Sequence, residues 1–166
     1  MITFGDAVNA DHIPFDYAAL YNQDCSYPCP TKQANRWDIS HRRWITFKGN
    51  PHASIIDFEP GTRDYQDPVL LRDWLKARAR DRKTRSAWIY SDLANAALAA
   101  HWARGMHFHW WIPTGDRVRR SQAELSALLK DHGVPASQAA PDLIAAHQMN
   151  GVTTLYDENV CWNWSH

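Results

Sequence analysis

Short apolar runs alternate with helical segments along most of the chain, and this alternation limits the folds open to it. Strands that alternate with helices of about 10 to 15 residues favour a mainly parallel sheet covered by helices. Each apolar run is rich in β-branched and aromatic residues and is bounded by Asp, Pro or Gly. The predicted strands are 17–22, 43–47, 53–58, 86–90, 106–112, 143–149 and a last one near 154–160.

Three helices are predicted from capping residues and from the spacing of apolar side chains. Asp67 and Pro68 supply an N-cap and a first-turn proline for the first helix. The second helix follows residues 91–92 and ends near 105. Ser121 and Glu124 form a capping box at the start of the third. Between 22 and 43 we expect a long loop with one helical turn.

The chain has 166 residues, of which 45% are hydrophobic, and this suits one domain spanning 1–166. A complete eightfold barrel normally needs about 200 residues or more. We therefore expect an α/β fold of the flattened or incomplete TIM-type (β/α) barrel class, with mainly parallel strands. Only residues 48–52 separate the second and third predicted strands, whereas a parallel crossover takes about a dozen. Those two strands should then not be parallel neighbours, or one of the two runs is not a strand.

Charge and hydropathy exclude several classes of partner. Eighteen basic and eighteen acidic side chains cancel to a net charge of zero, which disfavours a general nucleic-acid binder. No apolar run reaches the roughly 20 residues that span a bilayer, and the first residues resemble no signal peptide.

The three cysteines, of which Cys25 and Cys29 lie close together, leave open whether those two form a disulfide.

Two acids end the third predicted strand after a buried Ile55-Ile56 pair. Because side chains alternate along a strand, Asp57 and Glu59 point to the same face, about 7 Å apart at the backbone. Ligand sites of parallel α/β folds gather at the carboxyl ends of the strands. Glycosidases use such paired acids as a proton donor and an ionised partner. A solvated turn with two surface acids is the alternative, and the Ile pair argues against it.

Other predicted strands end in aromatic and hydrogen-bonding residues. Around the paired acids they suit a sugar, which has apolar faces and hydroxyl edges. For each residue singly, a core aromatic with satisfied polar atoms is the alternative. The candidate substrate-binding residues are Tyr21, Tyr90, His109, Trp110, Gln148 and Asp157.

A metal site is a weaker hypothesis. His107 and His109 share a face of their predicted strand, and a third ligand such as His101 or His147 would complete a site. The sequence contains no HExxH, paired CxxC, GxSxG or glycine-rich phosphate motif. We therefore expect no metal ion and no cofactor.

The segments ASIIDFEPG, AWIYSDL, FHWWIPTG, IAAHQM and TLYDENV follow one another in an order that resembles a known family. Short lysozyme-like relatives of glycoside hydrolase family 25, found in actinobacteria and their phages, have a DxE strand end, then a Tyr-Ser strand end and a Trp-rich strand. A His/Gln or Trp/Gln strand and a Tyr-Asp segment close their chains. The resemblance covers roughly residues 17–160.

The resemblance implies a muramidase that cuts peptidoglycan next to N-acetylmuramic acid with retention. Glu59 would be the general acid, and Asp57 would orient the acetamido group of the substrate as an internal nucleophile. Tyr90, Trp110 and Gln148 would line the sugar groove, and Asp157 would close its rim.

The chain departs from the family at the first strand, where full members carry an Asp in a DxSxxQ-like pattern. Tyr21-Asn22-Gln23 stands on the strand aligned there, and Asp6 would replace that Asp only if 2–8 is itself a barrel strand. Two functions stay open. One is a muramidase-like endolysin or virion-associated lysin. The other is a non-catalytic glycan-binding or virion structural module on the same scaffold.

The expected partner is bacterial cell-wall glycan, with other virion proteins as further candidates and without nucleic acid or membrane insertion. With no signal peptide, the expected location is the host cytoplasm before release, or the virion if a phage encodes the chain.

Overall fold

The strands of the computed structural model form one closed barrel in which they follow one another in chain order. The structure describes residues 1–7, 10–25, 28–59, 67–80, 87–149, 157–162 and 164. The strands are β1 (Ile2–Asp6), β2 (Ala18–Tyr21), β3 (Arg42–Thr46), β4 (Ile55–Asp57), β5 (Trp88–Tyr90), β6 (His109–Pro113), β7 (Ile144–Met149) and β8 (Asp157–Cys161).

Strands β1 to β7 pair with their neighbours in parallel, whereas β8 runs antiparallel to both β7 and β1. The prediction of a mainly parallel α/β fold is therefore confirmed, and the barrel is closed rather than open. The predicted strands fall within a few residues of the observed ones. The part of the last strand at 154–156 lies outside the described residues.

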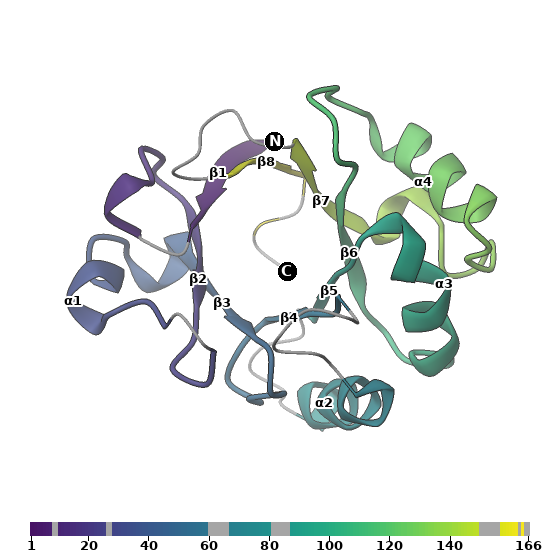
Figure 1. Ribbon diagram of the computed structural model, residues 1–166, viewed down its shortest axis with the longest axis horizontal. Helices are drawn as coiled ribbons and strands as arrows, with labels where there is room; N and C mark the ends of the chain where they lie inside the picture. The colour runs from purple at the N-terminus through teal and green to yellow at the C-terminus, as the bar shows by residue number, and fades with distance from the viewer. Residues whose placement is uncertain are drawn as a thin grey trace.

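The described helices lie on the outside of the ring of strands (Figure 1). They are α1 (Thr31–Ala34), α2 (Pro68–Arg80), α3 (Leu93–Trp102) and α4 (Gln122–Asp131), with short 3-10 helices η1 (Ala10–His12), η2 (Ile39–His41) and η3 (Pro141–Leu143). In Figure 1, α1 lies beside β2 and β3, α2 below β4 and β5, and α3 and α4 beside β6 and β7. The predicted capping box is confirmed, because Ser121 and Glu124 each bind the backbone of the other. The predicted cap of the second helix is also present, since Asp92 accepts from the Asn95 N–H.

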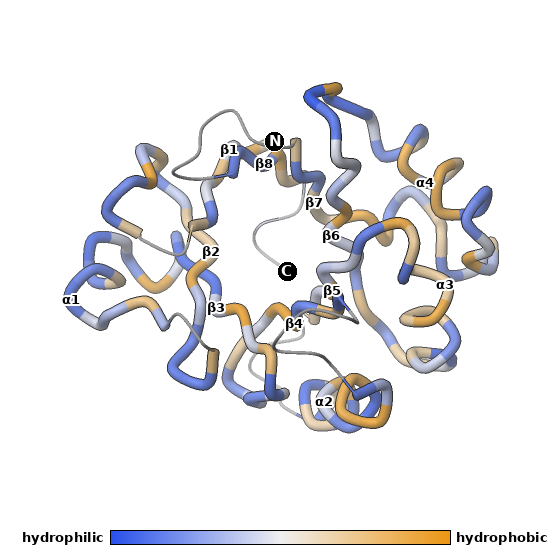
Figure 2. Tube along the Cα trace, viewed as in Figure 1, coloured by the Kyte–Doolittle hydropathy of each residue, from blue (hydrophilic) through white to orange (hydrophobic). Residues whose placement is uncertain are grey.

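Apolar side chains form two layers because residues alternate across each strand. The outer layer lies between the strands and α2, α3 and α4. It includes Ile56, Ile89, Trp110 and Ile112 from the strands and Leu71, Trp74, Ala96 and Leu125 from the helices. Hydrophilic and hydrophobic stretches alternate along α2 and α4, as expected for helices with one face on a barrel (Figure 2). The inner layer fills the barrel with Phe4, Ile45, Ile55, Trp88, Trp111, Ala146 and Cys161.

An aromatic floor, formed by Phe4, Tyr17, Trp88 and Trp164, closes the amino end of the barrel. The Trp164 ring packs against Phe4 and Tyr17 at centroid distances of 5.1 and 5.2 Å. The Arg43 guanidinium lies 4.2 Å from the ring centroid of Trp88 and donates to the Trp164 carbonyl. This end of the barrel is therefore filled, which leaves the carboxyl ends of the strands as the place for a site.

The expectation about the connection between β3 and β4 is wrong, because these strands are parallel neighbours. The register explains how eight residues, 47–54, suffice: Ile55 lies opposite Ile45, so the chain returns by only one residue after Thr46. The Thr46 hydroxyl then accepts from the backbone N–H groups of Lys48 and Asn50 and fixes the turn. Parallel neighbours usually need a crossover of about a dozen residues or more, and the stagger of β4 relative to β3 shortens the return here.

The first strand of the barrel is β1, not the 17–22 segment, which is β2. Asp6 could replace the first-strand Asp of the family only if its segment is a barrel strand, and Asp6 does end such a strand. The strand pattern of ITFGD is interrupted by Gly5, so periodicity alone gives little sign of it. Gly5 is needed for packing: a Cβ there would lie 2.7 Å from Cγ2 of Ile13 and 3.1 Å from Cδ2 of Phe15.

We expect Gly5→Ala to destabilise the protein by about 1–3 kcal/mol, the usual cost of overpacking a filled core. Ile13 is 1% exposed and has little room to move. In the double variant Gly5→Ala/Ile13→Ala the closer contact, with Ile13, disappears and only that with Phe15 remains, so the cost of the double variant should be smaller than the sum of the two single costs. Urea unfolding of the four proteins measures this, and additive costs would contradict the close packing of β1 on Ile13.

Candidate active site

Four acids meet at the carboxyl end of the barrel, and we call Asp6, Asp57, Glu59 and Asp157 the acidic cluster. Asp6 ends β1 and Asp57 ends β4, while Asp157 begins the antiparallel β8 and so lies at the same end. Their proximity shows in their electrostatics, since the charges of Asp157 and Glu59 both raise the pKa of Asp6. Barrel enzymes carry their catalytic groups at this end.

Asp57 and Glu59 both lie near Tyr21 and Tyr90, since the charges of the two acids raise the pKa of these tyrosines. Asp57 is 6% exposed, and the intervening Phe58 is fully buried in the outer layer. The Phe58 N–H donates to the Tyr90 carbonyl at 2.8 Å, which continues the strand pairing beyond Asp57 and carries Glu59 onto the inner face. Glu59 is half-buried, and its pKa is raised by burial first and by the charge of Asp92 second.

Two predicted substrate-binding tyrosines stand beside these acids. Burial raises the pKa of Tyr21 and of Tyr90 well above the ordinary value, and the charges of Asp6, Asp57 and Glu59 raise both further. Both phenols are therefore neutral and able to donate hydrogen bonds. The Tyr90 ring also packs edge-on against Trp111 at a centroid distance of 4.8 Å.

Gln148 and Asp157 form a hydrogen-bonded pair at the acidic cluster. The Gln148 Nε2 donates to Asp157 Oδ2 at 3.0 Å. Gln148 is 4% exposed, and its Oε1 has no hydrogen-bond partner among the residues that the structure describes. A buried acceptor without a donor costs about 1–3 kcal/mol. The site thus favours a ligand that brings a hydroxyl or an N–H to this oxygen.

Asp6 is held by residues that the sequence-based site did not include. Asn159 Nδ2 donates to Asp6 Oδ2 at 2.7 Å, and Trp111 Nε1 donates to Asn159 Oδ1 at 2.9 Å. All three side chains are buried. Burial, followed by the charge of Asp157, raises the pKa of Asp6 to about 8 against a lowering by Asn159. Side chains alternate along β6, so Trp110 and Ile112 point to the outer layer and Trp111 points inward. This alternation is the sequence signal that could have identified Trp111 rather than Trp110.

Two predicted residues lie elsewhere. Trp110 is fully buried in the outer layer, where its Nε1 donates to the Gln138 carbonyl at 2.7 Å, so the expectation that it lines the groove is corrected. His109 begins β6 and pairs with Trp88, two residues nearer the amino end of the barrel than the Trp111–Tyr90 pair. Strand register therefore removes both residues from the acidic cluster.

The two histidines considered as metal ligands, His107 and His109, lie side by side, but the described residues form no metal centre. The rings of His107 and His109 lie 5.1 Å apart at their centroids. Within the described part of the chain, no group of three or more His, Cys, Asp or Glu side chains is placed to hold a metal ion.

Cys25 and Cys29, for which the sequence left a disulfide open, are buried free thiols.

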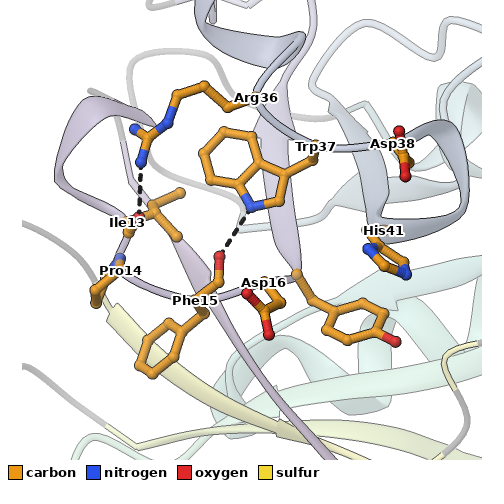
Figure 3. A pocket seen from close by; sticks show the side chains of 9 residues that line it. Ile13, Pro14, Phe15, Asp16, Arg36, Trp37, Asp38 and His41 are labelled. Carbon is orange, nitrogen blue, oxygen red and sulfur yellow. Dashed lines mark hydrogen bonds between the residues drawn. The ribbon is translucent and has the colours of Figure 1, made fainter.

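A separate hollow of about 470 Å³ lies between the segment before β2 and the segment from α1 to η2 (Figure 3). Its walls are tied by internal bonds, since Trp37 Nε1 donates to the Phe15 carbonyl and Arg36 donates to the Ile13 carbonyl. Tyr17 lines this hollow and immediately precedes β2, whereas Tyr21 ends that strand. The hollow is therefore at the opposite end of β2 from the acidic cluster.

No protein-family model, curated protein or solved structure matches the chain. None of the helices that the structure describes is long and apolar enough to cross a bilayer. The function is therefore inferred from the residues of the acidic cluster and their surroundings.

We expect Asp6→Asn to change how stability depends on pH. The pKa of Asp6 is about 8 in the folded protein and 3.8 as an ordinary carboxyl, so the folded state keeps a proton that the unfolded chain releases between these values. This contribution to the free energy of unfolding is fully present below about pH 4 and is lost as the pH rises through 8, by up to about 1.4 kcal/mol per pH unit.

Asn at position 6 keeps an acceptor for Asn159 but does not ionise. Urea unfolding at pH 5 and pH 8 should therefore show a larger loss for the wild type than for Asp6→Asn. Parallel pH curves for the two proteins would show that the wild-type carboxyl ionises in the ordinary range.

Proposed function

We propose that the chain is a glycoside hydrolase that cleaves bacterial cell-wall peptidoglycan, on a flattened TIM-type (β/α) barrel like that of family 25 lysozymes. The observation that carries this proposal is the pair of acids at the end of β4, where Asp57 is buried and burial raises the pKa of the half-buried Glu59. Glycosidases need one carboxyl that keeps its proton beside another that stabilises positive charge on the sugar.

In this mechanism Glu59 is the general acid. Its raised pKa favours the protonated form at a higher pH than an exposed Glu, and its proton goes to the glycosidic oxygen as the bond to the anomeric carbon breaks. Asp57 accepts from the acetamido N–H of the sugar and so holds the acetamido carbonyl oxygen under the anomeric carbon. That oxygen forms the new bond. Water, deprotonated by the Glu59 carboxylate, then opens the intermediate with retention.

The residues around the two acids support a saccharide ligand. Tyr21 and Tyr90 are neutral donors beside them, and the Oε1 of Gln148 is a buried acceptor that a sugar hydroxyl would satisfy. Aromatic faces with a few placed polar groups are what sugar sites present. The partner on this proposal is the glycan of the bacterial wall, whether the protein is a free lysin or part of a virion.

The position of Asp6 favours the enzyme over a non-catalytic glycan-binding module. The departure from the family pattern at the first strand argues for such a module, and Asp6 supplies an acid at the end of β1. The acidic cluster then has one acid from each place that the family pattern requires.

We expect Glu59→Gln to lower the release of reducing ends from purified peptidoglycan by about 100-fold or more, because a general acid contributes roughly 10²–10⁴-fold. Glu158→Gln is the matched control. Glu158 is the residue after Asp157 on β8 and points to the other face, so its loss should leave turnover unchanged. Sedimentation with cell walls should be retained by both variants.

Two outcomes would contradict the enzyme. Equal turnover by wild type and Glu59→Gln would remove Glu59 from the chemistry. Sedimentation of the wild type with walls, without any release of reducing ends, would instead identify a glycan-binding module.

A further inference from the structure

Asp6 faces another acid across the seam that closes the barrel. It lies directly opposite Asp157 in the antiparallel pairing of β1 with β8. The Cβ atoms of directly opposed residues in such a pair are about 4.5–5.5 Å apart. Two carboxylates at that separation, with Glu59 also near, repel each other strongly, so the pair keeps one proton over a wide pH range.

The surroundings assign this proton to Asp6. Asp157 is half-buried and accepts from the Nε2 of Gln148, which stabilises it as a carboxylate. Asp6 is 5% exposed, and its charged form has lost nearly all contact with water. Between two acids that repel each other, the more buried one takes the proton.

The amide that contacts Asp6 has a fixed orientation. The Trp111 indole N–H is only a donor, so the atom of Asn159 that meets it must be the carbonyl Oδ1. The Nδ2 of Asn159 is thereby directed at Asp6 Oδ2, and it also donates to the Asp157 carbonyl at 3.2 Å. An amide that accepts from an indole cannot turn round without losing that bond and bringing its carbonyl against Asp6.

We propose that Asp6 serves the site as a neutral hydrogen-bond donor, and that Trp111 and Asn159 are positioning residues that decide which of its oxygens carries the proton. Because Oδ2 accepts from Asn159, the hydroxyl is at Oδ1. This hydroxyl donates to an acceptor oxygen of the ligand, which is a sugar hydroxyl or an acetamido carbonyl. The identity of the ligand depends on the proposed function, whereas the protonation of Asp6 does not.

The protonation of Asp6 is tested by ¹³C NMR titration of the whole protein labelled at its aspartate carboxyl groups. The Asp6 signal is assigned as the one that is missing from the spectrum of Asp6→Asn. We expect the Asp6 midpoint near pH 8 in the wild type. In Trp111→Phe the Asn159 amide is free to turn and to accept from the neutral acid, so the midpoint should rise further.

Trp88→Phe is the matched control for the loss of an indole. Trp88 is fully buried in the same inner layer, and its Nε1 has no hydrogen-bond partner among the described residues, so the Asp6 midpoint should stay where it is. Titration of wild-type Asp6 with the exposed aspartates would overturn the proposal even if Trp111→Phe fails to fold. An equal shift in the two tryptophan variants would show a packing effect and overturn the positioning role.

The donor role is tested by two substitutions of Asp6. Asn at this position keeps an N–H group where the hydroxyl was, whereas Ala has no donor. We expect Asp6→Ala to lower turnover of peptidoglycan about tenfold more than Asp6→Asn does, the loss expected for one buried hydrogen bond. Losses of equal size would show that Asp6 acts as a carboxylate.

Failure of the proposed function has a different signature. If the wild type releases no reducing ends, the glycosidase assignment fails while the NMR titration still decides the state of Asp6. The same two variants are then compared by sedimentation with cell walls, where Asp6→Ala must bind more weakly than Asp6→Asn for the donor role to hold.

Discussion

The antiparallel pairing of β8 with β1 is the constraint on which the rest of the site depends. It closes the barrel and places Asp157 directly opposite Asp6. A parallel last strand would begin at the amino end, where the aromatic floor lies, and would put Asp157 far from the other acids. Because β8 runs the other way, its first residue contributes to the acidic cluster and Asn159 reaches both Trp111 and Asp6.

The acidic cluster brings together two buried and two half-buried acids, and protonation is how the fold tolerates their repulsion. Ionising all four acids there would set like charges side by side at low dielectric. Keeping Asp6 neutral removes one charge, and burial, which raises the pKa of Glu59, favours the neutral form of that acid as well. Repulsion that opposes folding at high pH thus supplies the protonated groups that the proposed chemistry needs.

Much of the fold follows from local signals, and the errors have definite physical causes. The capping box at Ser121 and the buried Ile pair before Asp57 each predict their element because one short segment carries the whole signal. The strand β1 and the short link from β3 to β4 depend on register and on contacts with distant residues, which no local pattern encodes. The prediction that Trp110 lines the sugar groove failed for the same reason, because only strand parity separates Trp110 in the outer layer from Trp111 in the inner one.

The most direct measurement of the central claim follows the tryptophan indole N–H signals by NMR while soluble peptidoglycan fragments are added. Trp111 lies within the hydrogen-bond chain to Asp6, whereas Trp37 donates to Phe15 in the separate hollow before β2. The account predicts that the Trp111 signal shifts on binding and that the Trp37 signal does not. A shift confined to Trp37, or no shift at saturating fragment, would contradict a saccharide site at the carboxyl end of the barrel.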